Sequence, residues 1–258
     1  MTVVSALGAS TGVLLPETAL VFEPDRSASV MVFEPSGDDP FEWIETDLSE
    51  PDAIAAAFEE IRERELGPVT GLVNNAGVAL GGTFDQVSEE NFDWLMSINF
   101  DAVVTLCRAF LPLLRQRPEA RIVNISSLFG LITPAGQTAY CASKFAVRGF
   151  TEALRQEMKL ENQPVAVSCV HPGGIRTNIV NAARMGKSEN AVAQRKGFDK
   201  LAMTTPEKAA EIIVKGILKN ESRILVGPDA WGIDAINRLL GSAYQPLVER
   251  FSRKNLYI

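Results

Sequence analysis

The sequence is poor in the residues that bind metal ions. Its 258 residues include one histidine, His171, and three cysteines, Cys107, Cys141 and Cys169. A structural zinc site needs about four such ligands at short spacing, and these cysteines are widely spaced in apolar or small-residue segments. We therefore expect no metal site and three reduced thiols in the core, as in a cytoplasmic protein. His171 has no serine, cysteine or metal ligand beside it in the sequence, which favours a structural role.

Basic runs and long apolar runs are also missing. Acidic residues outnumber basic ones by 32 to 25, and no basic stretch is suited to follow a phosphate backbone, so nucleic acid is not the expected partner. No segment approaches the roughly 18 consecutive apolar residues of a membrane-spanning helix, and the first residues lack the pattern of a signal peptide. We expect a cytoplasmic protein without a transmembrane segment.

Short apolar runs rich in β-branched residues alternate with longer helical patterns. This alternation is typical of successive βα units and predicts an α/β protein with a mainly parallel sheet. We find no internal repeat and no linker rich in proline, glycine or serine, so a single domain is expected. The predicted strands are Ser29 to Phe33, Val69 to Val73, Arg121 to Ile125, Val165 to Val170 and Arg223 to Val226.

Several predicted helices have clear ends. One pattern runs from Asp52 to Leu66 before Gly67-Pro68, and another from Ser88 to about Gln116 before Pro118. Thr205 is a predicted N-cap, since Pro206 would occupy the first helical position. A helix through Tyr140 is predicted to run to about Leu160.

The most informative pattern is Tyr140-Cys-Ala-Ser-Lys144, which follows Ser127 by thirteen residues. Residues four apart share one face of a helix, so the lysine ammonium is expected close to the phenol. A nearby positive charge favours the phenolate and would lower the tyrosine pKa from about 10 towards neutrality. Ser127 could hydrogen-bond the oxygen that gains or loses the proton.

Two further polar segments follow predicted strands. Asn74-Asn75-Ala76-Gly77 comes directly after Gly71-Leu72-Val73, and His171-Pro172-Gly173-Gly174-Ile175-Arg176-Thr177 follows another strand. Open α/β sheets bind their ligands at the carboxyl ends of parallel strands, so these segments and Ser127 are predicted to share one crevice.

Together these residues resemble the short-chain dehydrogenase/reductase family from about Val30 to Val226. The motifs are Asn74 to Gly77, Asn99, Ser127, Tyr140-x-x-x-Lys144 and Pro172-Gly-x-x-x-Thr177. The resemblance implies a Rossmann-like, doubly wound, mainly parallel sheet with helices on both faces. It divides the domain into a cofactor-binding half, about 1–125, and a catalytic and substrate half, about 126–258. The implied reaction is hydride transfer between a nicotinamide and a secondary alcohol or ketone.

The resemblance also implies a role for each residue. Tyr140 would be the acid/base and Ser127 would hold the substrate oxygen. Lys144 would lower the tyrosine pKa and bind the nicotinamide ribose, and Asn99 would fix a water that links Lys144 to solvent. The implied cofactor contacts in these segments are Asn75, Ala76, Gly77, Tyr140, Lys144, Pro172, Gly173, Ile175 and Thr177.

The phosphate-binding segment departs from the family pattern. Gly8 and Gly12 match two of its glycines, but Leu14 stands where the last glycine is expected. That glycine allows a helix to pack closely on the first strand, and Pro16 removes a backbone donor near the predicted helix start. We expect a first helix of about two turns that ends at Pro24, and weakened cofactor binding.

The adenosine side is better matched. Glu34 is expected at the end of the second strand, where a carboxylate accepts hydrogen bonds from the ribose hydroxyls and repels a 2′-phosphate. NAD is therefore favoured over NADP. Asp47 and Leu48 match the pair that contacts adenine in similar proteins, and the segment between Glu34 and Asp47 is too short for the helix usually found there.

Several alternatives stay open. The altered glycine segment is also compatible with a non-catalytic dinucleotide sensor or scaffold, and an epimerase or dehydratase is disfavoured because related enzymes carry a larger C-terminal domain. Residues 178–204 are expected to form an amphipathic lid over a small or lipophilic alcohol or carbonyl. A homodimer or homotetramer is expected through helices 91–116 and 140–160. The helical stretch 231–251 could be a partner face, a substrate wall or a membrane-seeking tail.

Overall fold

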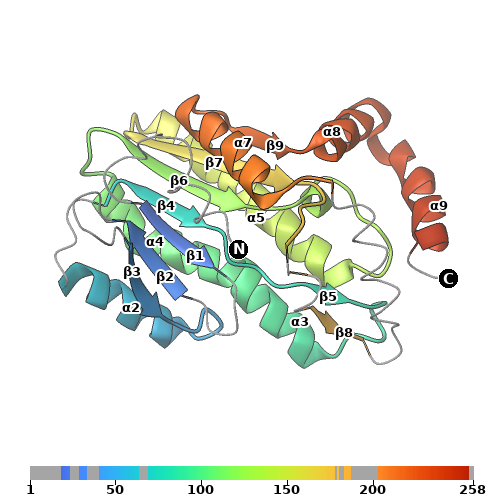
Figure 1. Ribbon diagram of the computed structural model, residues 1–258, viewed down its shortest axis with the longest axis horizontal. Helices are drawn as coiled ribbons and strands as arrows, with labels where there is room; N and C mark the ends of the chain where they lie inside the picture. The colour runs from blue at the N-terminus through green and yellow to red at the C-terminus, as the bar shows by residue number, and fades with distance from the viewer. Residues whose placement is uncertain are drawn as a thin grey trace.

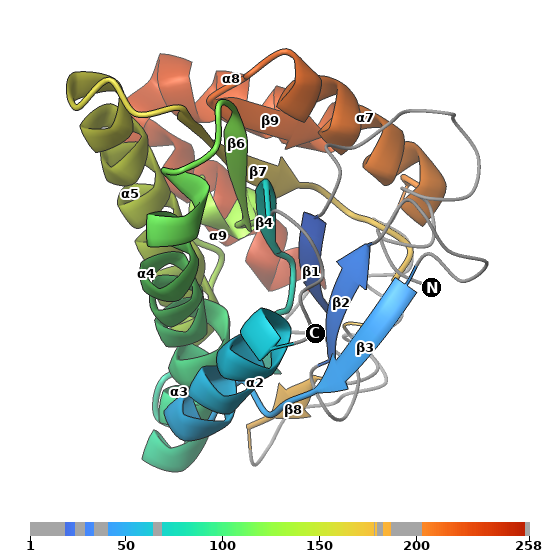
Figure 2. The ribbon, with the colours of Figure 1, turned by 90° about the vertical axis from the view of Figure 1, so that its left-hand side faces the viewer.

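A seven-stranded sheet organises the computed structural model of the protein (Figure 1). The structure describes residues 19–23, 29–33, 41–63, 69–177, 179, 183–186 and 203–255. The strand order is β3-β2-β1-β4-β6-β7-β9. Helices α2, α4 and α5 cover one face and α7 covers the other (Figure 2). The predicted α/β class, with a mainly parallel sheet between two helical layers, is confirmed.

The central strands are those that the β-branched runs predicted. Strands β4 (Gly71–Asn74), β6 (Ala120–Ile125), β7 (Val165–Pro172) and β9 (Arg223–Val226) pair in parallel. Both faces of these strands are covered, so most of their residues are apolar and do not alternate regularly with polar ones. Their carboxyl ends therefore meet at one edge of the sheet.

The N-terminal part of the sheet differs from the prediction. Residues Ala19–Glu23 form strand β1, where a first helix was expected, so that expectation is wrong. The run Ala-Leu-Val-Phe is apolar and lies between Pro16 and Pro24, which leaves too few residues for a stable helix but enough for a strand. Strand β1 pairs in parallel with β4 and antiparallel with β2 (Ser29–Phe33). Strand β3 (Phe41–Glu45) then pairs antiparallel with β2.

The helices begin and end close to the predicted signals. Helix α2 spans Pro51–Glu63, α5 spans Thr138–Leu160, and α7 spans Pro206–Leu218 with Thr205 as its N-cap. Ser88 caps α3. The C-terminal stretch is helical as predicted. Its elements are α8 (Pro228–Leu240), the 3-10 turn η3 (Gly241–Tyr244) and α9 (Gln245–Asn255).

One continuous helical run joins α3 (Glu89–Met96), the π-helical turn η1 (Ser97–Asp101) and α4 (Ala102–Leu114). Among the described residues it is the one helix long and apolar enough to cross a membrane, with a mean hydropathy of 1.4. Its apolar residues Leu106, Phe110 and Leu114 are buried in the core against the sheet. These residues of the run therefore serve the core, and 39% of its most apolar window is buried.

Candidate functional site

The sheet brings the predicted site segments to one edge. Asn74 at the end of β4 is in register with Asn124 of β6, and the side-chain amide of Asn74 donates to Asn124 Oδ1 at 2.8 Å. Ser127 follows β6, and Pro172 ends β7. The sheet edge predicted from the strand order thus carries the three polar segments and the start of α5.

Ser127 and Tyr140 meet at this edge. Ser127 has an extended backbone and caps the 3-10 turn η2 (Leu128–Gly130), with its hydroxyl accepting the amide of Phe129 at 3.1 Å. The Ser127 hydroxyl lies close enough to the Tyr140 side chain to favour its phenolate and lower its pKa. The tyrosine ring packs edge-on against Phe129, with the ring centroids 6.1 Å apart. Both residues are partly exposed.

Lys144 lies one helical turn beyond Tyr140 and is buried, with 3% of its surface exposed. Its ammonium donates to the carbonyl of Ile125 at 3.1 Å, and it lies 5.7 Å from the centre of the Tyr140 ring. Burial lowers the pKa of Lys144 to about 8, because the charged form loses its hydration. An ammonium has three donors, so donors remain for a ligand.

The expected lowering of the tyrosine pKa is not found. Burial raises the pKa of Tyr140 to about 12 and outweighs the opposing hydrogen bond from Ser127. The physical reason is that desolvation penalises both charged forms, the phenolate and the ammonium, and that the ammonium is held by the Ile125 carbonyl. The phenol therefore keeps its proton in the protein without ligands.

Asn99 is buried and fully hydrogen-bonded, as expected. It lies in the π-helical turn η1, and its amide nitrogen donates to the Val78 carbonyl at 3.0 Å and to Ser143 Oγ at 3.1 Å. Its oxygen accepts the Val78 amide at 2.8 Å. A Cβ added to Gly77 would lie 3.4 Å from this oxygen and 3.2 Å from Lys144 Nζ. Asn99 thus fixes the chain just after β4 against α5.

The segment Asn75-Ala76-Gly77 brings backbone close to the lysine. Ala76 and Gly77 are buried, while Asn75 is partly exposed at the rim. Because Gly77 has no side chain, the Lys144 ammonium can approach its backbone closely.

The turn after β7 is held from two sides. The amide of Gly173 donates to the Val226 carbonyl at 2.9 Å, and the amide of Gly174 donates to Asp229 Oδ2 at 2.6 Å. Ile175 forms a bridge with Thr204 and is buried, whereas Thr177 is exposed. The turn is therefore rigid where it would present the Ile175 amide and the Thr177 hydroxyl.

The adenosine side is described only in part. Gly8, Gly12 and Glu34 lie outside the described residues. Asp47 is exposed at the end of β3, where its carboxylate accepts the Ser49 amide at 2.8 Å. Leu48 is buried in the main core cluster. In the protein without ligands, Asp47 therefore stabilises the start of α2 and Leu48 packs in the core.

The direction of β2 bears on cofactor binding. A dinucleotide site of the implied kind needs a parallel β-α-β crossover, with a helix N-terminus facing the pyrophosphate. Here β1 and β2 are antiparallel, and Phe33 at the end of β2 lies beyond Val32, which pairs with Leu20 near the start of β1. The carboxyl end of β2 thus lies at the edge of the sheet opposite the site. The described residues include those expected on the nicotinamide side, whereas the segment expected to hold the pyrophosphate, 8–14, lies outside them.

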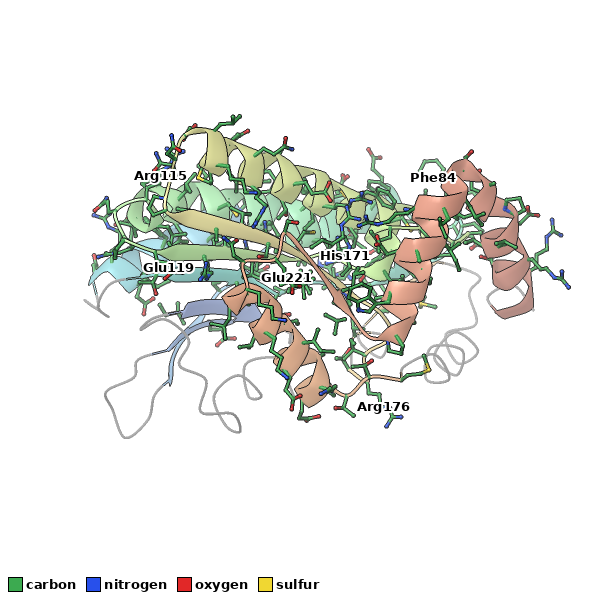
Figure 3. The ribbon with its side chains drawn as sticks, turned by 90° about the horizontal axis from the view of Figure 1, so that it is seen from above. Phe84, Arg115, Glu119, His171, Arg176 and Glu221 are labelled. Carbon is green, nitrogen blue, oxygen red and sulfur yellow. The ribbon has the colours of Figure 1, made fainter. Side chains whose placement is uncertain are left out.

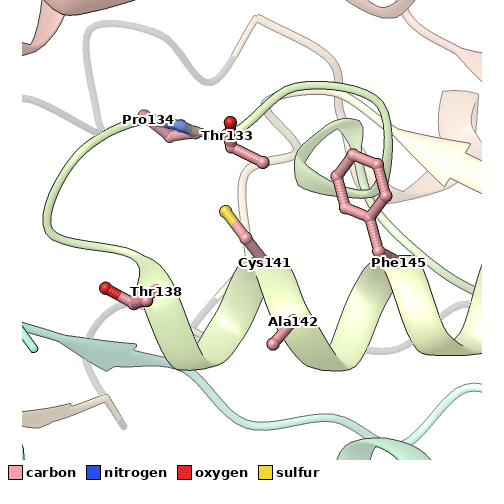
Figure 4. A pocket seen from close by; sticks show the side chains of 6 residues that line it. All are labelled: Thr133, Pro134, Thr138, Cys141, Ala142 and Phe145. Atoms are coloured by element: carbon pink, nitrogen blue, oxygen red, sulfur yellow. The ribbon is translucent and has the colours of Figure 1, made fainter.

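Apolar side chains flank the tyrosine. A cluster around Leu80, Leu95 and Ala139 includes Val78, Trp94, Met96 and Tyr140. A separate pocket of about 340 Å³ opens on the solvent side of α5 (Figure 4). It is lined by Thr133, Pro134, Thr138, Cys141, Ala142 and Phe145. That pocket does not include the tyrosine or the lysine, so the surface beside Tyr140 is the better candidate for substrate contact.

The structure adds residues that sequence reasoning missed. Ser143 joins Asn99 to α5, and Asp229 holds the turn after β7. Arg184, in the short strand β8 (Arg184–Met185), stacks over Trp94 at 3.7 Å, and β8 pairs with β5 (Leu80–Gly81). Only Ser143 had a sequence signal, since it lies between Tyr140 and Lys144. Within the described parts of the chain, no group of three or more metal-ligating side chains is found.

The fold and the site define a class of protein, namely a doubly wound α/β protein with a serine, a tyrosine and a lysine gathered at the ligand-binding edge of its sheet. Residues 24–188 match the model of the short chain dehydrogenase family. The chain belongs to this family. It is 44% identical over 203 residues to SadH of Mycobacterium tuberculosis, an oxidoreductase by name, covering 78% of this chain and 73% of SadH. It is 32% identical over 197 residues to the 3-dehydrosphinganine reductase of Danio rerio, covering 75% and 55% of the two chains.

Solved structures of short-chain dehydrogenases share the fold of this chain. A short-chain dehydrogenase from Streptomyces avermitilis superimposes with a TM-score of 0.67 at 30% identity, covering 82% of this chain and 79% of that one. One from Sphingobium yanoikuyae, in complex with NADPH, has a TM-score of 0.61 at 27% identity and covers 78% and 72% of the chains. A third from Burkholderia phymatum, in complex with NAD, has a TM-score of 0.69 at 24% identity and covers 80% and 76%. The chain is therefore a member of an oxidoreductase family in which solved relatives bind NAD or NADPH.

Proposed function

We propose that the protein is an NAD(P)-dependent oxidoreductase that interconverts a secondary alcohol and a ketone. The observation that carries the proposal is the meeting of Ser127, Tyr140 and the buried Lys144 at the carboxyl end of β6. A bound nicotinamide would supply or accept the hydride. The adenosine side, with Asp47 and Asn75 at its rim, would belong to the half of the domain before residue 126. NAD over NADP stays a prediction that rests on Glu34.

The proposed chemistry of the chain is proton transfer. Ser127 holds the substrate oxygen beside the Tyr140 hydroxyl, and the phenol donates its proton to that oxygen during reduction of a ketone. A tyrosine with a pKa of about 12 is protonated at neutral pH, as this direction requires. In the opposite direction the phenolate takes the proton, and the Lys144 ammonium stabilises it while binding the ribose. Asn99 would hold the water that links Lys144 to solvent.

The substrate we propose is a lipophilic carbonyl or alcohol. The cluster that includes Val78, Trp94 and Met96 gives the surroundings of Tyr140 an apolar character. The similarity to a 3-dehydrosphinganine reductase supports the same substrate class. Residues 183–186 of the expected lid lie along β5 next to this cluster, while most of 178–204 lies outside the described residues.

The first test is turnover with a panel of aliphatic ketones and secondary alcohols, with NADH and NADPH side by side. We expect Tyr140→Phe to abolish turnover, because the phenyl ring keeps the packing against Phe129 but has no proton to transfer. Phe129→Leu serves as the complementary control, since it removes the ring contact that Tyr140→Phe keeps and leaves the phenol in place. Full activity of Tyr140→Phe would refute the proposal.

A non-catalytic dinucleotide sensor or scaffold is the second candidate. The antiparallel pairing of β1 and β2 favours it, because a dinucleotide site of the implied kind is built on a parallel β-α-β crossover. A folded wild-type protein that binds NADH but turns over no member of the panel would support the sensor. Assembly into a homodimer or homotetramer remains a prediction for either function.

A further inference from the structure

His171 is the one histidine of the chain, and the proposed reaction makes no use of it. It lies inside the protein at the end of β7 with none of its surface exposed (Figure 3). In the sheet it is in register with Leu225 of β9. Its imidazole is thus neither a surface group nor a ligand of a metal cluster within the described residues.

The imidazole contacts the backbone of the proposed site. Nδ1 lies 2.9 Å from the carbonyl oxygen of Ser127. A carbonyl oxygen can only accept, so Nδ1 carries the proton and donates it. The same carbonyl accepts the amide of Gly130 at 2.9 Å, which closes the turn η2. The hydroxyl of Ser127 accepts the Phe129 amide from the same turn.

The imidazole is also unsuited to proton transfer. Burial lowers the pKa of His171 to about 4, so the ring is neutral at physiological pH. Its Nε2 is buried and has no hydrogen-bond partner among the described residues. A neutral ring with one donating nitrogen can fix a carbonyl, but it cannot relay a proton to Tyr140.

We propose that His171 is a positioning residue for Ser127. The Nδ1–H holds the Ser127 carbonyl from within the sheet, so that η2 directs the Ser127 hydroxyl towards Tyr140. This inference rests on the proposed function, in which that hydroxyl binds the substrate oxygen. Without the donor, the junction between β6 and η2 keeps only the Gly130 bond to this carbonyl, and the hydroxyl is free to shift.

The test compares His171→Asn with His171→Gln. The amide nitrogen of asparagine can occupy the place of Nδ1, whereas that of glutamine reaches the place of Nε2. We expect His171→Gln to lower kcat by about 10- to 100-fold, as misplacement of a reacting group by about 1 Å does. KM for NADH should not change. His171→Asn should keep kcat within about threefold of the wild type. The Tm values of both variants show whether each still folds stably.

A double-mutant cycle with Ser127→Ala separates positioning from general destabilisation. If His171 acts through Ser127, the glutamine variant lowers kcat no further once the Ser127 hydroxyl is gone. The inference would be overturned if the asparagine and glutamine variants lost kcat equally. It would also be overturned if the losses of kcat from His171→Gln and Ser127→Ala were fully additive. If the wild type shows no turnover, the proposed function fails. The ¹⁵N spectrum of the single imidazole then decides the contact, since an Nδ1–H tautomer supports it and an Nε2–H tautomer refutes it.

Discussion

At the scale of single residues, burial controls the charged groups of the site more strongly than their neighbours do. Lys144 and Tyr140 are four residues apart, yet burial moves their pKa values in opposite directions, to about 8 and about 12. Both shifts favour the neutral forms. The site thus combines a phenol that holds its proton with an ammonium that loses its proton more readily than a solvated lysine.

The effect of burial on a pKa can be tested at His171, because the sequence has no other histidine whose titration would overlap with it. Its pKa is about 4 in the folded protein, lowered first by burial and also by Arg223 and Arg148, while the hydrogen bond to the Ser127 backbone and the charge of Glu152 oppose this shift. The unfolded chain, with a histidine pKa of about 6.5, binds more protons between pH 4 and 6.5. The free energy of unfolding therefore falls as the pH is lowered through this window, by about 3 kcal/mol in total.

The measurement is urea unfolding at several pH values, with His171→Asn as the reference in which the carboxylates are unchanged. The wild type and the variant should differ in their free energy of unfolding, and we expect this difference to change by about 3 kcal/mol between pH 6.5 and 4. In the NMR spectrum, the imidazole signals should not titrate above about pH 5. A midpoint near 6.5 would show that the ring is hydrated.

At the scale of elements, charged groups hold α8 to the sheet. Asp234 of α8 binds Arg223 of β9 at 2.9 Å and Arg238 at 2.7 Å, and its side chain is 8% exposed. Helix α9 carries a similar pair, Glu249 and Arg253, also four residues apart, but Glu249 is 61% exposed. The two pairs share sequence spacing and differ in burial.

This contrast predicts unequal effects of substitution. Asp234→Ala leaves Arg223 partly buried with one partner fewer, and we expect it to lower the free energy of unfolding by about 3 kcal/mol. Glu249→Ala should change it by less than about 0.5 kcal/mol, since water screens the exposed pair. Chemical denaturation measures the change in the free energy of unfolding for both substitutions. Similar effects of the two substitutions would mean that burial does not set the strength of these ion pairs.

The sequence predicted the elements whose signals are local. The β-branched runs of β6, β7 and β9 and the Thr205-Pro206 start of α7 were found where expected, and the spacing of Ser127, Tyr140 and Lys144 indicated their meeting. Contacts between distant segments left no such signal. The carboxylate of Asp229 lies against Gly173, where a Cβ would approach it to 2.2 Å, and 55 residues separate Gly174 from this partner.

Two of the predictions from the sequence were wrong, and each has its own physical cause. The spacing of Tyr140 and Lys144 fixes a shared helix face but not how far it is buried, so the direction of the tyrosine pKa shift was wrong. Residues 19–23 are a short apolar run, for which periodicity does not separate strand from helix. Their pairing with β4 decides the outcome, and it depends on a strand that follows some fifty residues later in the sequence.

At the scale of the whole molecule, the two ends of the sheet differ in construction. From β4 to β9 the strands are parallel and joined by helical segments, whereas β1, β2 and β3 form an antiparallel meander (Figure 2). A parallel pairing of β1 and β2 would need a crossover of about a dozen residues or more, whereas β1 ends at Glu23 and β2 begins at Ser29. The nicotinamide side of the expected cofactor site is thus built on the regular half, and the pyrophosphate side falls on the altered half.

This asymmetry predicts that the adenosine half of a dinucleotide adds little affinity. We expect NADH to bind weakly but measurably, with a Kd no more than about tenfold below that of reduced nicotinamide mononucleotide, which amounts to about 1.4 kcal/mol. Fluorescence titration of the reduced nicotinamide measures both constants. Lys144→Met is the matched control, because both ligands carry the ribose that Lys144 would bind, and it should weaken the two equally.

Two results would contradict this expectation. A flat NADH titration up to millimolar concentration would refute cofactor binding itself, and the proposed function with it. A preference for NADH over the mononucleotide of more than about a hundredfold, or about 2.7 kcal/mol, would show that the pyrophosphate and adenosine are firmly held. The antiparallel meander would then be compatible with a full dinucleotide site, and the ribose contact at Lys144 would contribute only a part of the binding.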